Sequence, residues 1–166
     1  MIGQVGKRLL LCALSAACSD VPTNFAGDYT MTLVNGPNDC NFQDWTQGST
    51  SNVTATISQS GSNATVTFTN ALTALYLDAL LGTHVFSGTV TASELKASYV
   101  GGKSIAVSGT ACTYTVDLTL DMTLDANGVL SGTVTIVPVT NRDASCGATN
   151  TCTSNVDTVS GARTSP

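Results

Sequence analysis

Residues Tyr114–Val139 have the sequence YTVDLTLDMTLDANGVLSGTVTIVPV, and this stretch decides the fold. Apolar and polar residues alternate strictly as far as Leu124, which is the pattern of a β-strand with one buried face. A turn follows at 125–128, where Asn and Gly tolerate the positive φ angles of a tight turn. The chain returns as a second strand with apolar residues on one face: Leu130, Val134 and Ile136. The stretch therefore predicts a long antiparallel β-hairpin.

The same alternation recurs along most of the chain outside this hairpin. Further strands are predicted at Gly27–Asn35, Val53–Ser58, Ala64–Thr69, Val85–Ala92, Leu95–Tyr99 and Asn155–Arg163. With the hairpin they make eight strands, nearly all of which can be joined in sequence as hairpins. This order predicts an all-β fold, an up-and-down antiparallel barrel. A β-sandwich is the alternative, although it requires longer crossovers between sheets.

One segment departs from the alternation and predicts the only helix, near residues 71–81. Its apolar residues recur three or four positions apart, which is the period of an α-helix. Asn70 is suited to begin the helix and Gly82 to end it. The apolar face would consist of Leu72, Leu75, Tyr76, Ala79 and Leu80.

Composition and charge limit the classes of function. The chain has 166 residues, of which 42% are hydrophobic and 10% are charged, so it is long and apolar enough for one domain with a core. Its formal net charge of −5 argues against nucleic-acid binding. No motif in the sequence indicates a cofactor.

The N-terminal residues predict export. Residues 1–17 combine Lys7 and Arg8 with the short apolar run Leu9–Leu14 and small residues, as in a signal peptide. The following cysteine completes the segment Leu14-Ser15-Ala16-Ala17-Cys18, which resembles the lipobox of bacterial lipoproteins. This resemblance implies lipid attachment at Cys18 and a location in the bacterial cell envelope, at the outer membrane or cell surface. Plain cleavage of a signal peptide is the alternative. The predicted domains are then a leader at 1–17, a tether at 18–26 and a barrel at 27–166.

The connections between the predicted strands differ in length at the two ends of the barrel. The turns after the second, fourth and sixth strands are tight, whereas those after the first, third, fifth and seventh are long. Four cysteines fall at the long-loop end, and in an exported chain they predict two disulfides. The expected neighbours in the barrel would bring Cys40 near Cys152 and Cys112 near Cys146, which favours these two disulfides. The alternative pairing, Cys146–Cys152 with Cys40–Cys112, remains open.

The first and last predicted strands bear a faint resemblance to lipocalins. The segment Gly27-Asp28-Tyr29 is similar to the Gly-x-Trp motif of the first lipocalin strand, with Tyr in place of Trp, and Arg163 stands where that family has an Arg packed over the ring. The resemblance implies a calyx that binds an apolar ligand.

The apolar face of the strands supplies candidate residues for lining such a cavity: Tyr29, Met31, Phe68, Phe86, Tyr99, Tyr114 and Met122. Small residues on the strands would allow a cavity, with the helix as a lid: Ala55, Ala64, Gly88, Ala92 and Gly132. A packed core is the favoured interpretation, because side chains alone can fill an eight-stranded barrel.

The sequence contains no constellation typical of catalysis or metal binding. Asp117, Asp121 and Asp125 share one strand face, but residues four apart in a strand are separated by roughly 13 Å and cannot share an ion. His84, the single histidine, has no nucleophile motif beside it. We therefore expect no enzyme and no metal site.

The sequence leaves three functional hypotheses. The first is a lipid-anchored exported protein that binds a hydrophobic small molecule or a protein partner at the long-loop end. The second is a structural or surface-interaction lipoprotein with a filled core, which makes contacts through the loop around Trp45 and the helix. The third is a small transmembrane outer-membrane barrel, which shares the asymmetry of short turns and long loops.

Overall fold

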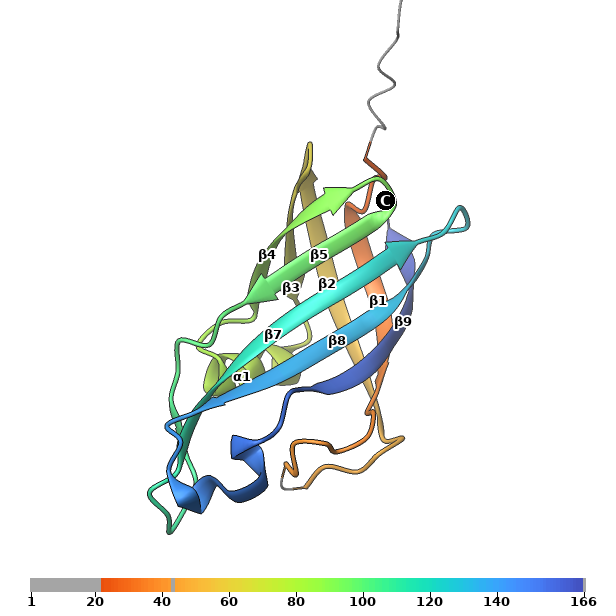
Figure 1. Cartoon of the computed structure of the whole chain (residues 1–166). Coiled ribbons are helices and arrows are strands. Elements are labelled where there is room, and N and C mark those ends of the chain that lie inside the picture. Colours follow the sequence, from red (N-terminus) through yellow and green to blue (C-terminus); the bar gives the residue numbers. More distant parts are fainter. Residues whose placement is uncertain (1–21, 43, 166) are drawn as a thin grey trace, which may run out of the picture.

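A computed structural model describes residues 22–42 and 44–165 (Figure 1). The predicted leader at 1–17 and the predicted lipid-attachment site Cys18 lie outside these residues. No helix in the described part of the chain is long and apolar enough to cross a bilayer.

Nine strands and two short helices make up the described structure. In chain order they are β1 (Gly27–Val34), β2 (Thr50–Ser60), β3 (Asn63–Phe68), α1 (Ala71–Leu80), β4 (Val85–Thr91), β5 (Glu94–Tyr99), β6 (Ile105–Ala106), β7 (Thr113–Leu124), β8 (Val129–Thr140), the 3-10 helix η1 (Ala144–Asn150) and β9 (Asn155–Ser165).

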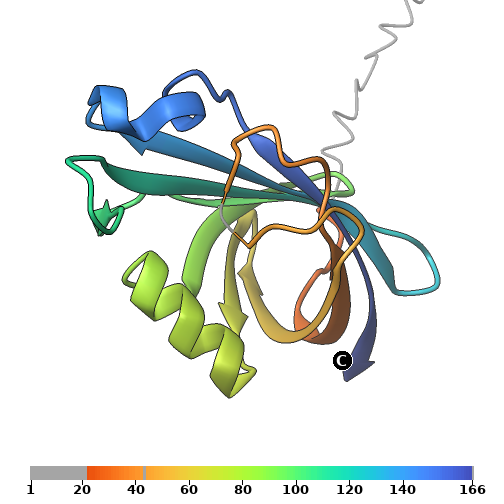
Figure 2. The same cartoon turned by 90° about the horizontal axis from the view of Figure 1, so that it is seen from below.

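Eight of the strands close into an antiparallel barrel, which confirms the predicted fold (Figures 1 and 2). Neighbours in the sheet follow the order β5-β4-β3-β2-β1-β9-β8-β7, and pairing of β5 with β7 completes the ring. The first and last strands pair from Asp28 with Ser165 to Val34 with Thr158, so the sheet has no open edge there. Consecutive barrel strands are neighbours throughout, which is the up-and-down arrangement rather than a sandwich.

The hairpin predicted at Tyr114–Val139 is the longest strand pair. Strands β7 and β8 pair from Leu124 with Leu130 to Tyr114 with Thr140. Asp125 Oδ1 accepts hydrogen bonds from the backbone N–H groups of Asn127 and Val129, both at 2.8 Å, and these bonds shape the turn. Gly128 has a φ of +79°, the conformation for which the sequence places glycine there.

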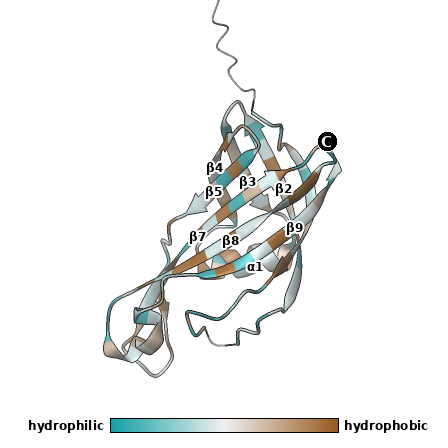
Figure 3. Ribbon diagram, turned by 45° about the vertical axis from the view of Figure 1, so that its right-hand side comes forward, coloured by the Kyte–Doolittle hydropathy of each residue, from teal (hydrophilic) through white to brown (hydrophobic). Residues whose placement is uncertain are grey.

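Hydrophobic and hydrophilic residues alternate along the strands (Figure 3), and the apolar ones form the buried core. Outward positions on β2, β3 and β4 carry hydroxyl side chains instead, including Thr54, Thr56, Ser58, Thr65, Thr67, Ser87 and Thr89. The core residues that are almost fully buried come from nearly every barrel strand, among them Tyr29, Ile57, Val66, Phe86, Val90, Leu95, Met122 and Leu130.

The two ends of the barrel differ as predicted. One end, here called the short-turn rim, holds the connections β2–β3, β4–β5 and β7–β8. The other end, here called the long-loop rim, holds residues 35–49, α1, residues 100–112 and residues 141–154. Strand β6 belongs to the long-loop rim and pairs with residues 113–114 of β7, so the region after β5 forms an extra hairpin.

The described end of the predicted tether is part of the folded unit. Phe25 is fully buried, and its N–H donates to Gln59 Oε1 at 2.7 Å. The N–H of Thr23 donates to the carbonyl of Ala92 at 2.7 Å, in the β4–β5 turn. Residues 23–26 therefore cover the short-turn rim, and the folded unit begins several residues before the predicted boundary at Gly27.

Helix α1 forms where the sequence predicts it, but its orientation differs from the prediction. Asn70 Oδ1 accepts from the N–H groups of Leu72 and Thr73 and caps the helix. Of the predicted apolar face, Leu72, Leu75 and Tyr76 are exposed, whereas Leu80 packs against the core beside the buried Leu77 and Leu81. Figure 2 shows α1 beside the ring of strands. The spacing of apolar residues identifies one face of a helix, but it does not show whether another part of the protein covers that face.

A second helix was not predicted. The 3-10 helix η1 lies in the loop before β9, where Asp143 Oδ1 accepts from the N–H of Ser145 at 2.9 Å. Gly147, with a φ of +54°, interrupts its helical backbone. So short a segment shows no regular spacing of apolar residues, and its sequence is therefore interpreted as a loop.

Candidate functional site at the long-loop rim

The barrel interior is filled rather than hollow. A void among the core side chains has a volume of about 10 Å³, which is room for about one water molecule. This void is lined by Met31, Leu33, Val66, Phe68, Leu120, Met122, Val134 and Val159. Three of the predicted lining residues, Met31, Phe68 and Met122, thus meet across a gap too small for a ligand.

The other predicted lining residues divide between the core and the rim. Phe86 is fully buried and packs edge-on against Phe68, with ring centroids 5.6 Å apart. Tyr99 is half-buried, packs edge-on against Phe86, and its hydroxyl donates to the carbonyl of Leu81 at 2.8 Å, which ties β5 to the end of α1. Tyr114 lies at the long-loop rim. The structure therefore does not gather the seven residues around one chamber.

Two of the small strand residues, Gly88 and Gly132, lie where neighbouring strands approach closely. A Cβ added to Gly88 would lie 2.6 Å from the Cα of Ala97 on β5. A Cβ added to Gly132 would lie 2.8 Å from the Cα of Met122 on β7. Small residues here allow tight packing between strands and do not leave empty space.

Tyr29 and Arg163 are in direct contact. The Arg163 guanidinium carbon lies 5.6 Å from the centroid of the Tyr29 ring, and Arg163 Nε donates to the Tyr29 hydroxyl at 3.0 Å. That hydroxyl donates in turn to the carbonyl of Phe25 at 2.8 Å. The contact joins the first strand, the last strand and the N-terminal cover of the barrel.

Two disulfides brace the long-loop rim. Cys40 is bonded to Cys152 and Cys112 to Cys146, with Cα–Cα distances of 4.8 and 4.9 Å. This is the pairing that strand neighbourhood favours. The first bond joins the loop after β1 to the segment before β9, and the second joins the start of β7 to η1.

Two buried polar side chains on β9 hold the loop that contains Trp45. Asn155, fully buried, accepts from the N–H of Cys40 at 2.9 Å. Asp157, only 4% exposed, accepts from the N–H of Gly36 at 3.0 Å. The Trp45 Nε1–H donates to the carbonyl of Gly36 at 3.0 Å. These bonds satisfy loop backbone groups that would otherwise be left unpaired on burial.

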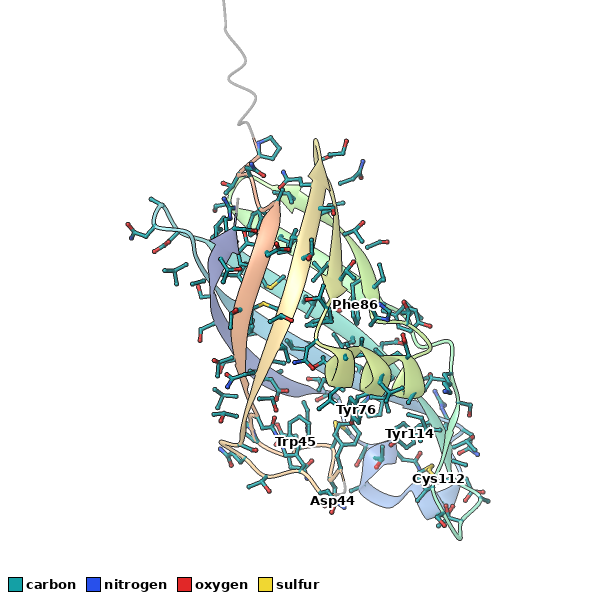
Figure 4. All side chains as sticks on the ribbon, turned by 180° about the vertical axis from the view of Figure 1, so that it is seen from behind. Asp44, Trp45, Tyr76, Phe86, Cys112 and Tyr114 are labelled. Carbon is teal, nitrogen blue, oxygen red and sulfur yellow. A yellow bond between two sulfur atoms is a disulfide. The ribbon has the colours of Figure 1, made fainter. Side chains whose placement is uncertain are left out.

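Aromatic side chains cluster at the same rim. The Phe42 ring centroid lies 5.9 Å from that of Trp45 and 6.5 Å from that of Tyr114. Figure 4 shows Trp45, Tyr76 and Tyr114 at one end of the molecule, with Phe86 among the strands above them. Phe42 carries no periodic signal, so alternation could not have assigned it to this cluster.

A pocket of about 360 Å³, here called the rim pocket, lies among these loops and outside the barrel interior. Its walls come from the loop after β1, from β6 and the residues after it, from the start of β7, and from η1. The lining residues are Asn41, Phe42, Ile105, Ala106, Val107, Ser108, Cys112, Tyr114, Ser145, Cys146 and Thr149. Only Tyr114 and the two cysteines were candidates from the sequence, because the other residues come together through loop packing.

The acidic and histidine residues weighed in the sequence have local structural roles. Asp121 forms an ion pair with Lys96 at 2.9 Å on the outer face, and Asp117 accepts from the N–H of Gly101 at 2.8 Å. His84 Nδ1 lies 2.8 Å from Asp78 Oδ1, which ties the loop after α1 to the helix. Within residues 22–42 and 44–165, no three His, Cys, Asp or Glu side chains are placed to hold a metal ion together.

Comparison with protein-family models, with curated proteins and with solved structures finds no match to this chain.

The carboxyl of Asp157 predicts an unusual pH dependence of stability. Burial raises its pKa, an effect that the hydrogen bond from Gly36 offsets only in part, so the fold favours the protonated form. At pH 3 the carboxyl is protonated in both the folded and unfolded states. Its contribution to stability is lost as the pH rises through the folded-state pKa. We expect Asp157→Asn to raise the melting temperature at pH 7 and to change it little at pH 3, as measured by circular dichroism.

Asp125→Asn is the matched control with the opposite sign. Backbone hydrogen bonds from Val129 and Asn127 lower the pKa of Asp125, so its carboxylate stabilises the fold above the unfolded-state pKa and loses that effect in acid. This variant should lower the melting temperature at pH 7. A lower melting temperature for Asp157→Asn at pH 7 would show that the fold requires the Asp157 charge.

Proposed function

We propose that this protein is an exported, lipid-anchored component of the bacterial cell envelope that binds a protein partner through its long-loop rim. The barrel serves as a rigid scaffold, and Cys18 is the lipid-attachment site. The lipobox-like segment at 14–18 supports the anchor. Two disulfides are consistent with folding in an oxidising compartment outside the cytoplasm.

The contacts of residues 23–26 support an orientation for the anchored molecule. Thr23 is bonded to the β4–β5 turn, so the chain enters the barrel at the short-turn rim. Cys18 precedes Thr23 by only five residues, a span of at most ~18 Å when extended. An anchor at Cys18 would therefore hold the short-turn rim near the membrane and direct the long-loop rim away from it.

The observation that carries the proposal is the exposed apolar stripe of α1 at the long-loop rim. Leu72 is 78% exposed, Leu75 67% and Tyr76 64%. Apolar side chains gathered on one exposed face are typical of an interaction surface. A protein partner fits better than a lipid surface, because α1 contains Asp78 and no basic residue that would attract anionic lipids.

The outer and inner faces of the barrel favour this function over the two alternatives. A transmembrane barrel needs an apolar outer band, whereas the outward positions on β2, β3 and β4 carry Thr and Ser. A carrier of hydrophobic molecules needs a chamber, whereas the interior void is about 10 Å³. Both faces are those of a solid, water-exposed scaffold.

Site-specific photocrosslinking tests the partner surface. We expect p-benzoylphenylalanine at Leu75, in the full chain expressed in its native cells, to give a discrete crosslinked protein band. Val129, 45% exposed at the opposite rim, is the matched control position and should give none. Leu72→Ser in the Leu75-labelled chain should weaken the band, since it removes part of the same surface. Equal bands from Leu75 and Val129, or none from either, would contradict the proposal.

Substitution at the proposed lipid-attachment site tests the anchor independently. Cys18→Ser removes the thiol that would carry the lipid, so the protein should move from the membrane fraction to the soluble fraction. Mass spectrometry of the unsubstituted protein should show a diacylglycerol-modified N-terminal cysteine. A soluble unsubstituted protein with an unmodified Cys18 would exclude the anchor and leave the rim surface to be judged by crosslinking.

A further inference from the structure

The rim pocket has a size and position suited to a small ligand. Its volume of about 360 Å³ falls at the lower end of the range for small-molecule sites, about 300–1,000 Å³. The Cys112–Cys146 disulfide contributes to its wall, so a covalent bond holds η1 against the start of β7. The walls are therefore braced before any ligand arrives, which lowers the entropic cost of binding.

The lining is uncharged but mixed in polarity. Ile105, Ala106 and Val107 form an aliphatic wall on β6 and the residue after it, while η1 presents hydroxyls from Ser145 and Thr149. No residue that lines the pocket carries a charge. A charged ligand would lose water without gaining an ionic partner from the lining, which disfavours phosphates, carboxylates and amines.

Polar groups in the lining are available for hydrogen bonds. The side chains of Asn41 and Ser108 and the hydroxyl of Tyr114 contribute donors and acceptors to the lining. The Ser145 hydroxyl donates to Asp143 at 2.6 Å and the Thr149 hydroxyl to the Cys40 carbonyl at 3.3 Å, so both oxygens can still accept. A purely apolar ligand would bury these groups without partners, at a cost.

Two aromatic rings complete the lining. Phe42 and Tyr114 lie with ring centroids 6.5 Å apart and planes inclined by 32°. Aromatic faces pack well against flat apolar surfaces, including the C–H face of a sugar ring. Burial raises the pKa of Tyr114, and proximity to Tyr76 adds to this, so its hydroxyl remains a neutral donor at physiological pH.

We propose that the rim pocket binds a neutral saccharide, with one sugar ring against Phe42 and Tyr114 and its hydroxyls bonded to the polar lining. A sugar ring has an apolar face and a hydroxyl-bearing edge. The face can pack against the apolar part of this uncharged lining, and the hydroxyls can form hydrogen bonds with its polar part. The inference deepens the proposed function, since it rests on the long-loop rim as the contact surface and names the chemistry that the partner, or a glycan attached to it, would present.

Nuclear magnetic resonance titration of the full chain in detergent tests the proposal. The probes are maltose, cellobiose and N,N′-diacetylchitobiose, with glucuronic acid and dodecanol as charged and apolar comparisons. We expect at least one neutral disaccharide to shift the amide signals of 105–108 and 145–149. Co-sedimentation with insoluble chitin and cellulose distinguishes a polymer from a free sugar as the source. Failure of every neutral saccharide, or binding of dodecanol or glucuronic acid in its place, would overturn the proposal.

Variants connect the binding to the lining. Tyr114→Leu removes both the aromatic ring and its hydroxyl, so the affinity for the saccharide should fall by about tenfold. Tyr114→Phe keeps the ring, so the affinity for the saccharide should fall less. Because this variant also keeps the packing of the ring, it distinguishes loss of a binding group from loss of the fold. Ser62→Ala, at an exposed serine of the short-turn rim, should have no effect. Equal affinity of all four proteins would also overturn the proposal.

The crosslinking and titration experiments can fail separately. Saccharide binding without a crosslink at Leu75 would reject a protein partner on α1 and retain the rim pocket as a sugar site. A crosslink without saccharide binding would retain the partner surface and reject the sugar site.

Discussion

The closed ladder of eight strands is the constraint on which the rest of the structure depends. Pairing of β1 with β9 and of β5 with β7 leaves no free edge in the ring, so every barrel strand is held on both sides. A ring of this size has an interior only wide enough for side chains, or for one small ligand when those side chains are small. Here large side chains and close strand contacts fill it. The space for binding therefore lies among the loops at one end.

The long-loop rim is ordered by bonds that the strands do not provide. Asn155 and Asp157 extend inward from the start of β9 and bind the backbone of the loop after β1. The Cys40–Cys152 bond closes a segment of 112 residues, for which the chain-entropy model gives a stabilisation on the order of 4–5 kcal/mol. The Cys112–Cys146 bond fixes η1 to the start of β7. These contacts hold the loop after β1 and the helix η1 in place beside the paired strands β6 and β7.

The sequence predicts the strands and their order well because inward and outward positions alternate with a period of two. In an up-and-down barrel successive connections alternate between the two ends, so the sequence also assigns each loop to one end. Proximity of the strand ends then favours the disulfide pairing found in the structure. The N-terminal cover at Phe25 was missed, since a single buried residue before the first strand has no period.

The candidate site was less predictable for the same physical reason. A helical period in α1 marks Leu72, Leu75 and Tyr76 as one face, yet whether that face is covered depends on how α1 sits on the barrel. Phe42, Ser108 and Thr149 come from three separate loops, and only the folded chain brings them to one pocket. Small strand residues would allow a cavity, but Gly88 and Gly132 serve the close approach of neighbouring backbones.

Methyl resonances of methionine offer the most direct test of the central claim that the barrel is a filled scaffold. The chain has three methionines, and the two after Met1, Met31 and Met122, both line the interior void. The account predicts that their ¹³C-methyl signals remain unchanged when the protein is titrated with fatty acids, retinol or a lipid extract of its own cells. Large shifts of both signals, at stoichiometric ligand, would show that the interior opens to hold a hydrophobic molecule and would contradict the account.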